Sequence, residues 1–120
     1  MERFRTAVEA HDPDAVVASL APDVVFRSPF VFAPYRGREV VGGILRAVMR
    51  VLEDFRYADQ LASATQHALV FTARVGDRTL DGIDLGVVNA DGLVSELTVF
   101  VRPMSGLAAL GEAMKRELSR

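Results

Sequence analysis

The sequence predicts an α+β domain in which a curved antiparallel sheet wraps around N-terminal helices and leaves a cone-shaped cavity. Apolar residues at helical spacing dominate the first half of the 120-residue chain, whereas four strand-like segments follow one another in the second half. Turn signals at Gly76-Asp77 and Asp91-Gly92 separate these strands, which favours hairpins and antiparallel pairing. Helices grouped ahead of a run of strands are typical of α+β rather than alternating βαβ folds.

Three helices are expected in the first half. Apolar residues at helical spacing predict a short helix over residues 4–11. Asp12 as N-cap starts a second helix, which has Leu20 on its buried side and is closed by Pro22. An i, i+3, i+4 apolar stripe predicts a third helix from Arg38 to Leu52, which is the strongest helical pattern in the chain.

One early strand and four later ones are expected. The segment "DVVFRS" is rich in β-forming residues, and the loop that follows it, "PFVFAPYRG", is apolar although loops are normally polar. The later strands cover residues 56–64, 67–75, 78–88 and 93–103. A last amphipathic helix follows, with Ser105 as its expected cap. One domain covering residues 1–120 accommodates all of these elements.

Composition excludes several classes of function. The net charge of −2 without a run of like charges argues against nucleic acid or an anionic membrane as a partner. No cysteine is present, and two histidines are too few to indicate a metal cluster, so we expect neither a metal site nor a cofactor. No stretch has the length of a signal peptide core or of a membrane span, which predicts a soluble cytoplasmic protein.

The later strands also bear on assembly. The segments "HALVFTARV" and "LVSELTVFVRP" are apolar on both faces. One face lines the cone, and the other needs cover that helices inside the cone cannot provide. We therefore expect a homodimer.

The segment "TLDGIDLG", residues 79–86, contains the strongest candidate for a functional side chain. Strand alternation places Asp84 on the same face as Gly82 and Gly86, whereas Asp81 points the opposite way. Glycine within a strand often marks the close approach of a ligand. Asp84 facing a cavity with open space on both sides is one interpretation, and Asp84 facing solvent beside two glycines that only bend the sheet is the other.

Three segments together resemble a known superfamily. "TLDGIDLGVVNADGLVSELTVF" is similar to the matching stretch of the ketosteroid isomerases, and "RSPFVFAPYRGREVV" and "HDPDAVVASLAPDVVF" fit the same family in the same order. The whole chain therefore resembles the NTF2-like, SnoaL-like superfamily of cone-shaped α+β domains. That superfamily contains isomerases, cyclases, epoxide hydrolases and binding modules. The resemblance therefore implies a particular fold but does not imply one particular function.

Only one of the three site residues of the isomerases has the same residue type at the matching position of this chain. Asp84 matches the aspartic acid that the family keeps protonated in its oxyanion hole. The tyrosine that is the second donor falls on Phe4, and the aspartate that is the general base falls on Ser28. A serine hydroxyl needs a base of its own to take a proton from carbon near neutral pH. Steroid isomerisation by the familiar route is therefore not expected.

The epoxide hydrolase site of the superfamily does not transfer either. Its Arg-x-Asp motif would put Asp84 as the base but Gly82 in place of the arginine, and its second acid would fall near Thr98. The expected site thus has Asp84 as its one catalytic candidate. The expected ligand-binding residues are Phe4, Ser28, Phe30, Tyr35, Gly82, Gly86, Thr98 and Phe100.

Two functions remain open on this evidence. The first is binding of a small apolar molecule without transforming it, and the second is an isomerase or cyclase that uses Asp84 as sole acid or base. A second titratable side chain inside the cone would favour the enzyme, because such catalysis separates the pKa values of an acid and a base. His67, Glu96 and Tyr35 are the expected candidates. If Asp84 faces an apolar cone, desolvation should raise its pKa.

Overall fold

One six-stranded sheet organises the chain, and the computed structural model describes it over residues 1–120. The strand order is β2-β1-β6-β5-β4-β3, and every neighbouring pair is antiparallel except β1 and β6, which are parallel. The α+β fold class is confirmed. The elements are α1 (Glu2–Glu9), α2 (Pro13–Ala18), β1 (Leu20–Arg27), β2 (Tyr35–Arg36), α3 (Arg38–Val51), β3 (Glu53–Ala62), β4 (His67–Val75), β5 (Arg78–Val88), β6 (Val94–Arg102) and α4 (Met104–Leu118).

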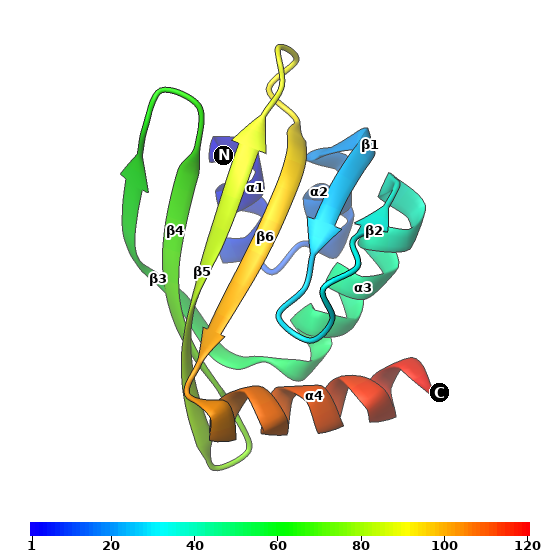
Figure 1. Cartoon of the computed structure of the whole chain (residues 1–120), viewed down its shortest axis with the longest axis vertical. Helices are drawn as coiled ribbons and strands as arrows, with labels where there is room; N and C mark the ends of the chain where they lie inside the picture. Colours follow the sequence, from blue (N-terminus) through cyan, green and yellow to red (C-terminus); the bar gives the residue numbers. More distant parts are fainter.

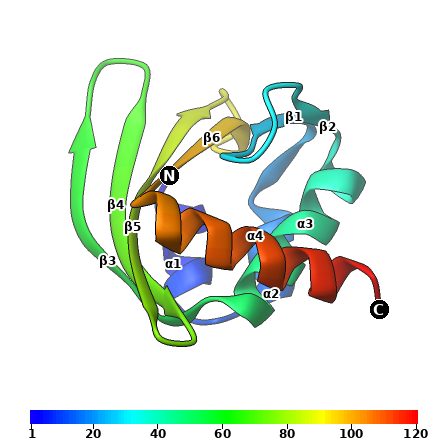
Figure 2. The same ribbon diagram turned by 60° about the horizontal axis from the view of Figure 1, so that its bottom comes forward.

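The helices cover the concave side of the sheet. Helix α1 lies behind β5 and β6 in Figure 1, α2 lies behind β1, and α4 crosses the lower end of the sheet. Figure 2 turns this end forward and shows the sheet curving around the helices. The apolar core joins helix faces to the inner sheet face, and its largest fully buried side chains include Leu20, Leu69, Leu80 and Leu97. None of the four helices is both long and apolar enough to cross a membrane.

The boundary between α2 and β1 differs from the expectation. Leu20 and Pro22 were expected to belong to the end of the helix, but α2 ends at Ala18 and β1 already begins at Leu20. The register between β1 and β6 shifts between Leu20 and Val25. Pro22, which has no N–H to donate to a ladder, is accommodated in this irregular part of the strand.

Other elements also differ from the sequence prediction. The short strand β2 pairs with β1 although its residues were expected in a loop. Strand β3 begins at Glu53, three residues earlier than predicted. Helix α4 begins at Met104, with Pro103 at the cap position and no side-chain cap bond, so the expected Ser105 cap is wrong.

A bulge in β6 decides which of its residues face the helices. Val88 pairs with Val94 and Val87 pairs with Glu96, so one extra residue lies in β6. A one-residue shift exchanges the two faces of a strand. Thr98 and Phe100, which we expected in the cavity, therefore lie on the outer face, and the inward positions after the bulge are Leu97, Val99 and Val101.

Candidate functional site

An apolar cavity of about 350 Å³ lies between the concave face of the sheet and the helices. Twenty of its 25 lining residues are hydrophobic, and the lining includes residues from all four helices and all six strands. Pockets of roughly 300 Å³ and above are typical of small-molecule sites. The cavity therefore has the size and the lining of a site for a small apolar molecule.

Asp84 is the buried carboxyl group of this cavity. The alternation of β5 turns Leu80, Gly82, Asp84 and Gly86 inward, as predicted, and leaves Asp84 only 8% exposed. Asp81 lies on the outer face, where Arg102 Nη1 donates to its Oδ2 at 2.9 Å. Asp84, by contrast, has no basic side chain among its hydrogen-bond partners.

Tyr57 is the hydrogen-bond partner of Asp84. The Tyr57 hydroxyl donates to Asp84 Oδ2 at 2.8 Å, and both residues line the cavity. Sequence reasoning missed Tyr57, because it considered only His67, Glu96 and Tyr35 as partners. The available signal was the i, i+2 spacing of the aromatic residues Phe55 and Tyr57, which places both on one face of a strand.

Neighbouring side chains hold the phenol ring of Tyr57 in place. The Phe55 ring meets it edge to face, with the ring centroids 5.0 Å apart. The Arg5 guanidinium lies 5.5 Å from its centroid, within the range of a cation–π contact, and Arg5 Nη1 also donates to Gln60 Oε1 at 2.6 Å. These contacts restrict the orientation of the ring that carries the hydroxyl.

Burial sets the protonation of this pair. Desolvation raises the pKa of the Asp84 carboxyl to about 7, and the hydrogen bond from Tyr57 opposes this rise. Burial also raises the pKa of the Tyr57 phenol above its usual range, and the nearby Asp84 carboxylate adds to that rise. Tyr57 therefore remains a donor near neutral pH, whereas Asp84 exists in both protonation states there.

The glycines beside Asp84 do not leave open space. A Cβ at Gly82 would lie 2.2 Å from Phe71 Cζ and 2.5 Å from the Phe100 carbonyl oxygen. A Cβ at Gly86 would lie 2.5 Å from Met1 Sδ. The expectation that these positions are open to a ligand was wrong, because the Phe71 ring and the Met1 side chain already fill them.

The cavity contains some of the other expected residues. Phe4, Ser28, Phe30 and Tyr35 all line it. Phe4 is 3% exposed and supplies apolar surface where the isomerases have a hydroxyl, and Tyr35 is at the rim, with its ring stacked on Phe26 at a centroid distance of 6.3 Å. The structure therefore brings four of the eight expected ligand-binding residues together with Asp84.

The other candidate partners of Asp84 lie elsewhere. Glu96 is on the outer face, where Arg27 Nη1 donates to it at 3.0 Å. His67 faces inward but does not line the cavity, and its buried Nδ1 has no hydrogen-bond partner. Two polar residues that were not expected in the site, His11 and Asp54, do line the cavity, and both have positive φ angles. No group of three or more His, Cys, Asp or Glu side chains is placed to hold a metal ion.

Comparisons with known proteins agree with this geometry. A family model described as a SnoaL-like domain matches residues 1–97. A steroid delta-isomerase from Pseudomonas aeruginosa is 46% identical, with a TM-score of 0.94, over 98% of this chain and 88% of that one. An uncharacterized protein with a cystatin-like fold from Silicibacter pomeroyi is 31% identical, with a TM-score of 0.92, over 98% and 84% of the two chains.

A more distant structure shows the fold alone. A SnoaL-like protein of unknown function from Burkholderia thailandensis is 20% identical, with a TM-score of 0.70, over 85% of this chain and 90% of that one. No protein of curated function matches the chain.

Proposed function

The chain belongs to the SnoaL-like domain family within the NTF2-like superfamily, and on that premise we propose that its cone binds a small, mostly apolar molecule through one oxygen atom. The observation that carries the proposal is the buried, hydrogen-bonded Tyr57–Asp84 pair in a cavity whose lining is mostly apolar. Asp84 Oδ2 accepts from Tyr57, so a protonated Asp84 has its other oxygen free to donate to a ligand carbonyl or hydroxyl. A buried polar group of this kind selects ligands that can complete its hydrogen bonds.

Matched aromatic probes test this proposal. We expect 2-naphthol to bind about fivefold more tightly than naphthalene, since one added hydrogen bond contributes about 1 kcal/mol. The preference should vanish in Asp84→Leu and persist in Asp81→Asn, which changes the outward-facing aspartate of the same strand. Fluorescence titration at pH 6 measures both affinities. Absence of saturable binding by either probe would overturn the proposal.

An isomerase or cyclase is the second candidate. The pKa of Asp84, near 7, suits a group that takes a proton from carbon and returns it to a neighbouring position. The 46% identity to a steroid delta-isomerase favours the same reaction class, although Phe4 and Ser28 stand where the two other familiar groups would be. A β,γ-unsaturated steroid ketone tests it, because isomerisation creates a conjugated enone that absorbs in the ultraviolet. A rate equal to that of buffer at pH 8 would exclude this activity.

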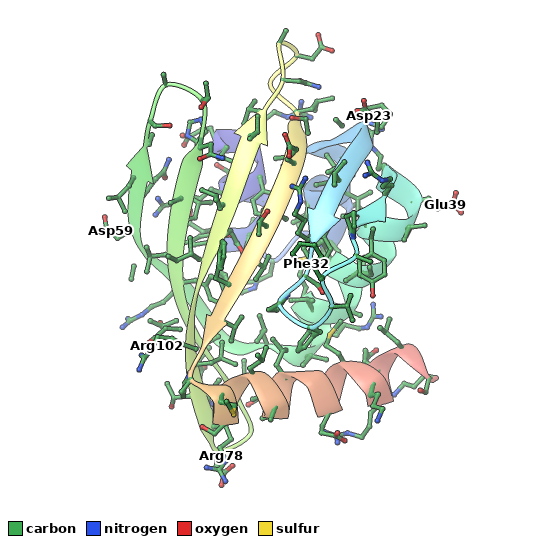
Figure 3. The ribbon with its side chains drawn as sticks, viewed as in Figure 1. Asp23, Phe32, Glu39, Asp59, Arg78 and Arg102 are labelled. Carbon is green, nitrogen blue, oxygen red and sulfur yellow. The ribbon has the colours of Figure 1, made fainter.

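The proposal includes a homodimer formed through the outer face of the sheet. Val70, Ile83 and Phe100 lie side by side across β4, β5 and β6, and Ile83 and Phe100 are 37% and 52% exposed. Arg102, the last residue of β6, is labelled near the lower end of the sheet in Figure 3. The row supports the dimer, because exposed apolar patches of this kind mark contact surfaces. A cytoplasmic location stays a prediction from the sequence.

Sedimentation at micromolar concentration tests the dimer. We expect the mass of two chains for the wild type and of one chain for Phe100→Asp, because the carboxylate would be buried without a partner at the contact. Val40→Asp is the matched control, since Val40 is also 52% exposed but lies on α3. A single-chain mass for the wild type would contradict the prediction.

A further inference from the structure

The hydroxyl group of Ser28 is held by the loop that follows β1. Its Oγ accepts hydrogen bonds from the backbone N–H groups of Phe30 at 3.2 Å and Val31 at 3.3 Å. A serine hydroxyl has two acceptor lone pairs and one proton to donate. Both acceptor positions are therefore used within the chain, and the hydroxyl proton is the part of Ser28 that remains for a ligand.

The register of the sheet places Ser28 on the same row as Asp84. Arg27 is level with Thr98 in the parallel pair of β1 and β6, so Ser28 follows level with Val99. Val99 in turn is the partner of Asp84 in β5. All three side chains of this row line the cavity. With strands about 4.8 Å apart, the Cα atoms of Ser28 and Asp84 are roughly 10 Å from each other.

The surface between these two polar groups is apolar. Val99 forms the floor of the row, and Phe26 and Leu97 extend it on the neighbouring row. A ligand with a single oxygen at Asp84 would leave the Ser28 proton beside apolar ligand surface. An unused donor in such a place loses its hydrogen bond to water without replacement.

These observations concern the ligand class within the proposed function, on which the following inference rests. We infer that Ser28 is a second hydrogen-bond donor in the cone and that the ligand is a ring compound with two oxygen functions on opposite sides. One oxygen meets Asp84 and Tyr57, the ring lies over Val99, and the other oxygen accepts from Ser28. The sequence placed Ser28 among the expected ligand-binding residues, at a position where the isomerases have a general base, but gave it no role as a donor.

A pair of probes that differ by one hydroxyl group tests the inference. We expect 2,6-dihydroxynaphthalene to bind wild-type protein about tenfold more tightly than 2-naphthol, from about fivefold for one additional hydrogen bond and about twofold for the symmetry of the ligand. The factor should fall to about two, the statistical advantage of a symmetric ligand, in Ser28→Ala. Ser28→Thr keeps a hydroxyl and should keep most of the factor. Fluorescence titration of both probes against all three proteins gives the ratios.

The 2-naphthol measurement separates this inference from the proposed function. Ser28→Ala also removes two loop hydrogen bonds. General damage to the site would lower the affinity of both probes, and the ratio of the two affinities in Ser28→Ala would then equal the ratio in wild type. A wild-type ratio of about two, or the same ratio in Ser28→Ala as in wild type, would overturn the inference. Failure of 2-naphthol to bind wild type at all would instead overturn the proposed function.

Discussion

Replacing Asp84 with asparagine is expected to change the pH dependence of stability more than any other single substitution of an acidic residue in this chain. The pKa of Asp84 is about 7 in the folded protein because of its burial, whereas an unfolded aspartate has a pKa near 4. The folded state thus holds this proton more tightly. The contribution of Asp84 to stability is full below pH 4 and is lost as the pH rises to 7.

The size of the effect follows from proton linkage. Between the two pKa values only the folded state carries the proton, so the free energy of unfolding decreases by about 1.4 kcal/mol per pH unit from this group. Over three units the loss amounts to roughly 4 kcal/mol. Asparagine does not titrate, and its amide oxygen can still accept from Tyr57. The stability of Asp84→Asn relative to wild type should therefore rise by that amount between pH 4 and pH 7, and then level off.

Urea unfolding of both proteins at several pH values measures this difference. Tyr57→Phe is an informative second variant, because the Tyr57 hydrogen bond lowers the pKa of Asp84 and its removal should extend the decline above pH 7. Asp81→Asn controls for the loss of any aspartate from β5. A difference between wild type and Asp84→Asn that stays constant from pH 4 to pH 8 would show that Asp84 titrates like an exposed carboxyl group.

The face of Asp84 was predictable from the sequence because strand alternation is a local property. Residues 80–88 alternate without a bulge before Val87, so the inward position of Asp84 followed from counting. The same count failed in β6, because no turn or glycine signal in the sequence marks the bulge there. Thr98 and Phe100 were consequently assigned to the wrong face.

Tyr57 could not be linked to Asp84 by a local argument. The two residues are 27 positions apart, and their contact depends on the order of β3, β4 and β5 and on the curvature of the sheet. The filling of Gly82 and Gly86 is a long-range property as well. The Met1 side chain covers Gly86 because α1 packs inside the sheet, and sequence spacing contains no information about that contact.

The two glycines that flank Asp84 should differ sharply in their tolerance of a methyl group. In Gly82→Ala the new Cβ would collide with the Phe71 ring and also with the Phe100 carbonyl oxygen, which belongs to the paired backbone of β6 and cannot move without breaking the ladder. Overpacking of this kind costs about 1–3 kcal/mol, and we expect the upper end of that range. The Phe71 ring also lines the cavity, so its displacement should weaken 2-naphthol binding as well.

In Gly86→Ala the methyl group meets only the far end of the Met1 side chain closely, while the nearest backbone oxygen, that of Glu96, is 3.6 Å away. Methionine has three rotatable bonds and can move aside, so we expect a loss below about 1 kcal/mol. Gly43→Ala provides the reference for an unobstructed site, because a Cβ there meets nothing within 4 Å and alanine favours the helix by about 1 kcal/mol. Thermal and urea unfolding of the three variants measure the order. Equal losses at Gly82 and Gly86 would mean that Phe71 yields as easily as Met1, and that the space beside Asp84 is as adaptable as the sequence first suggested.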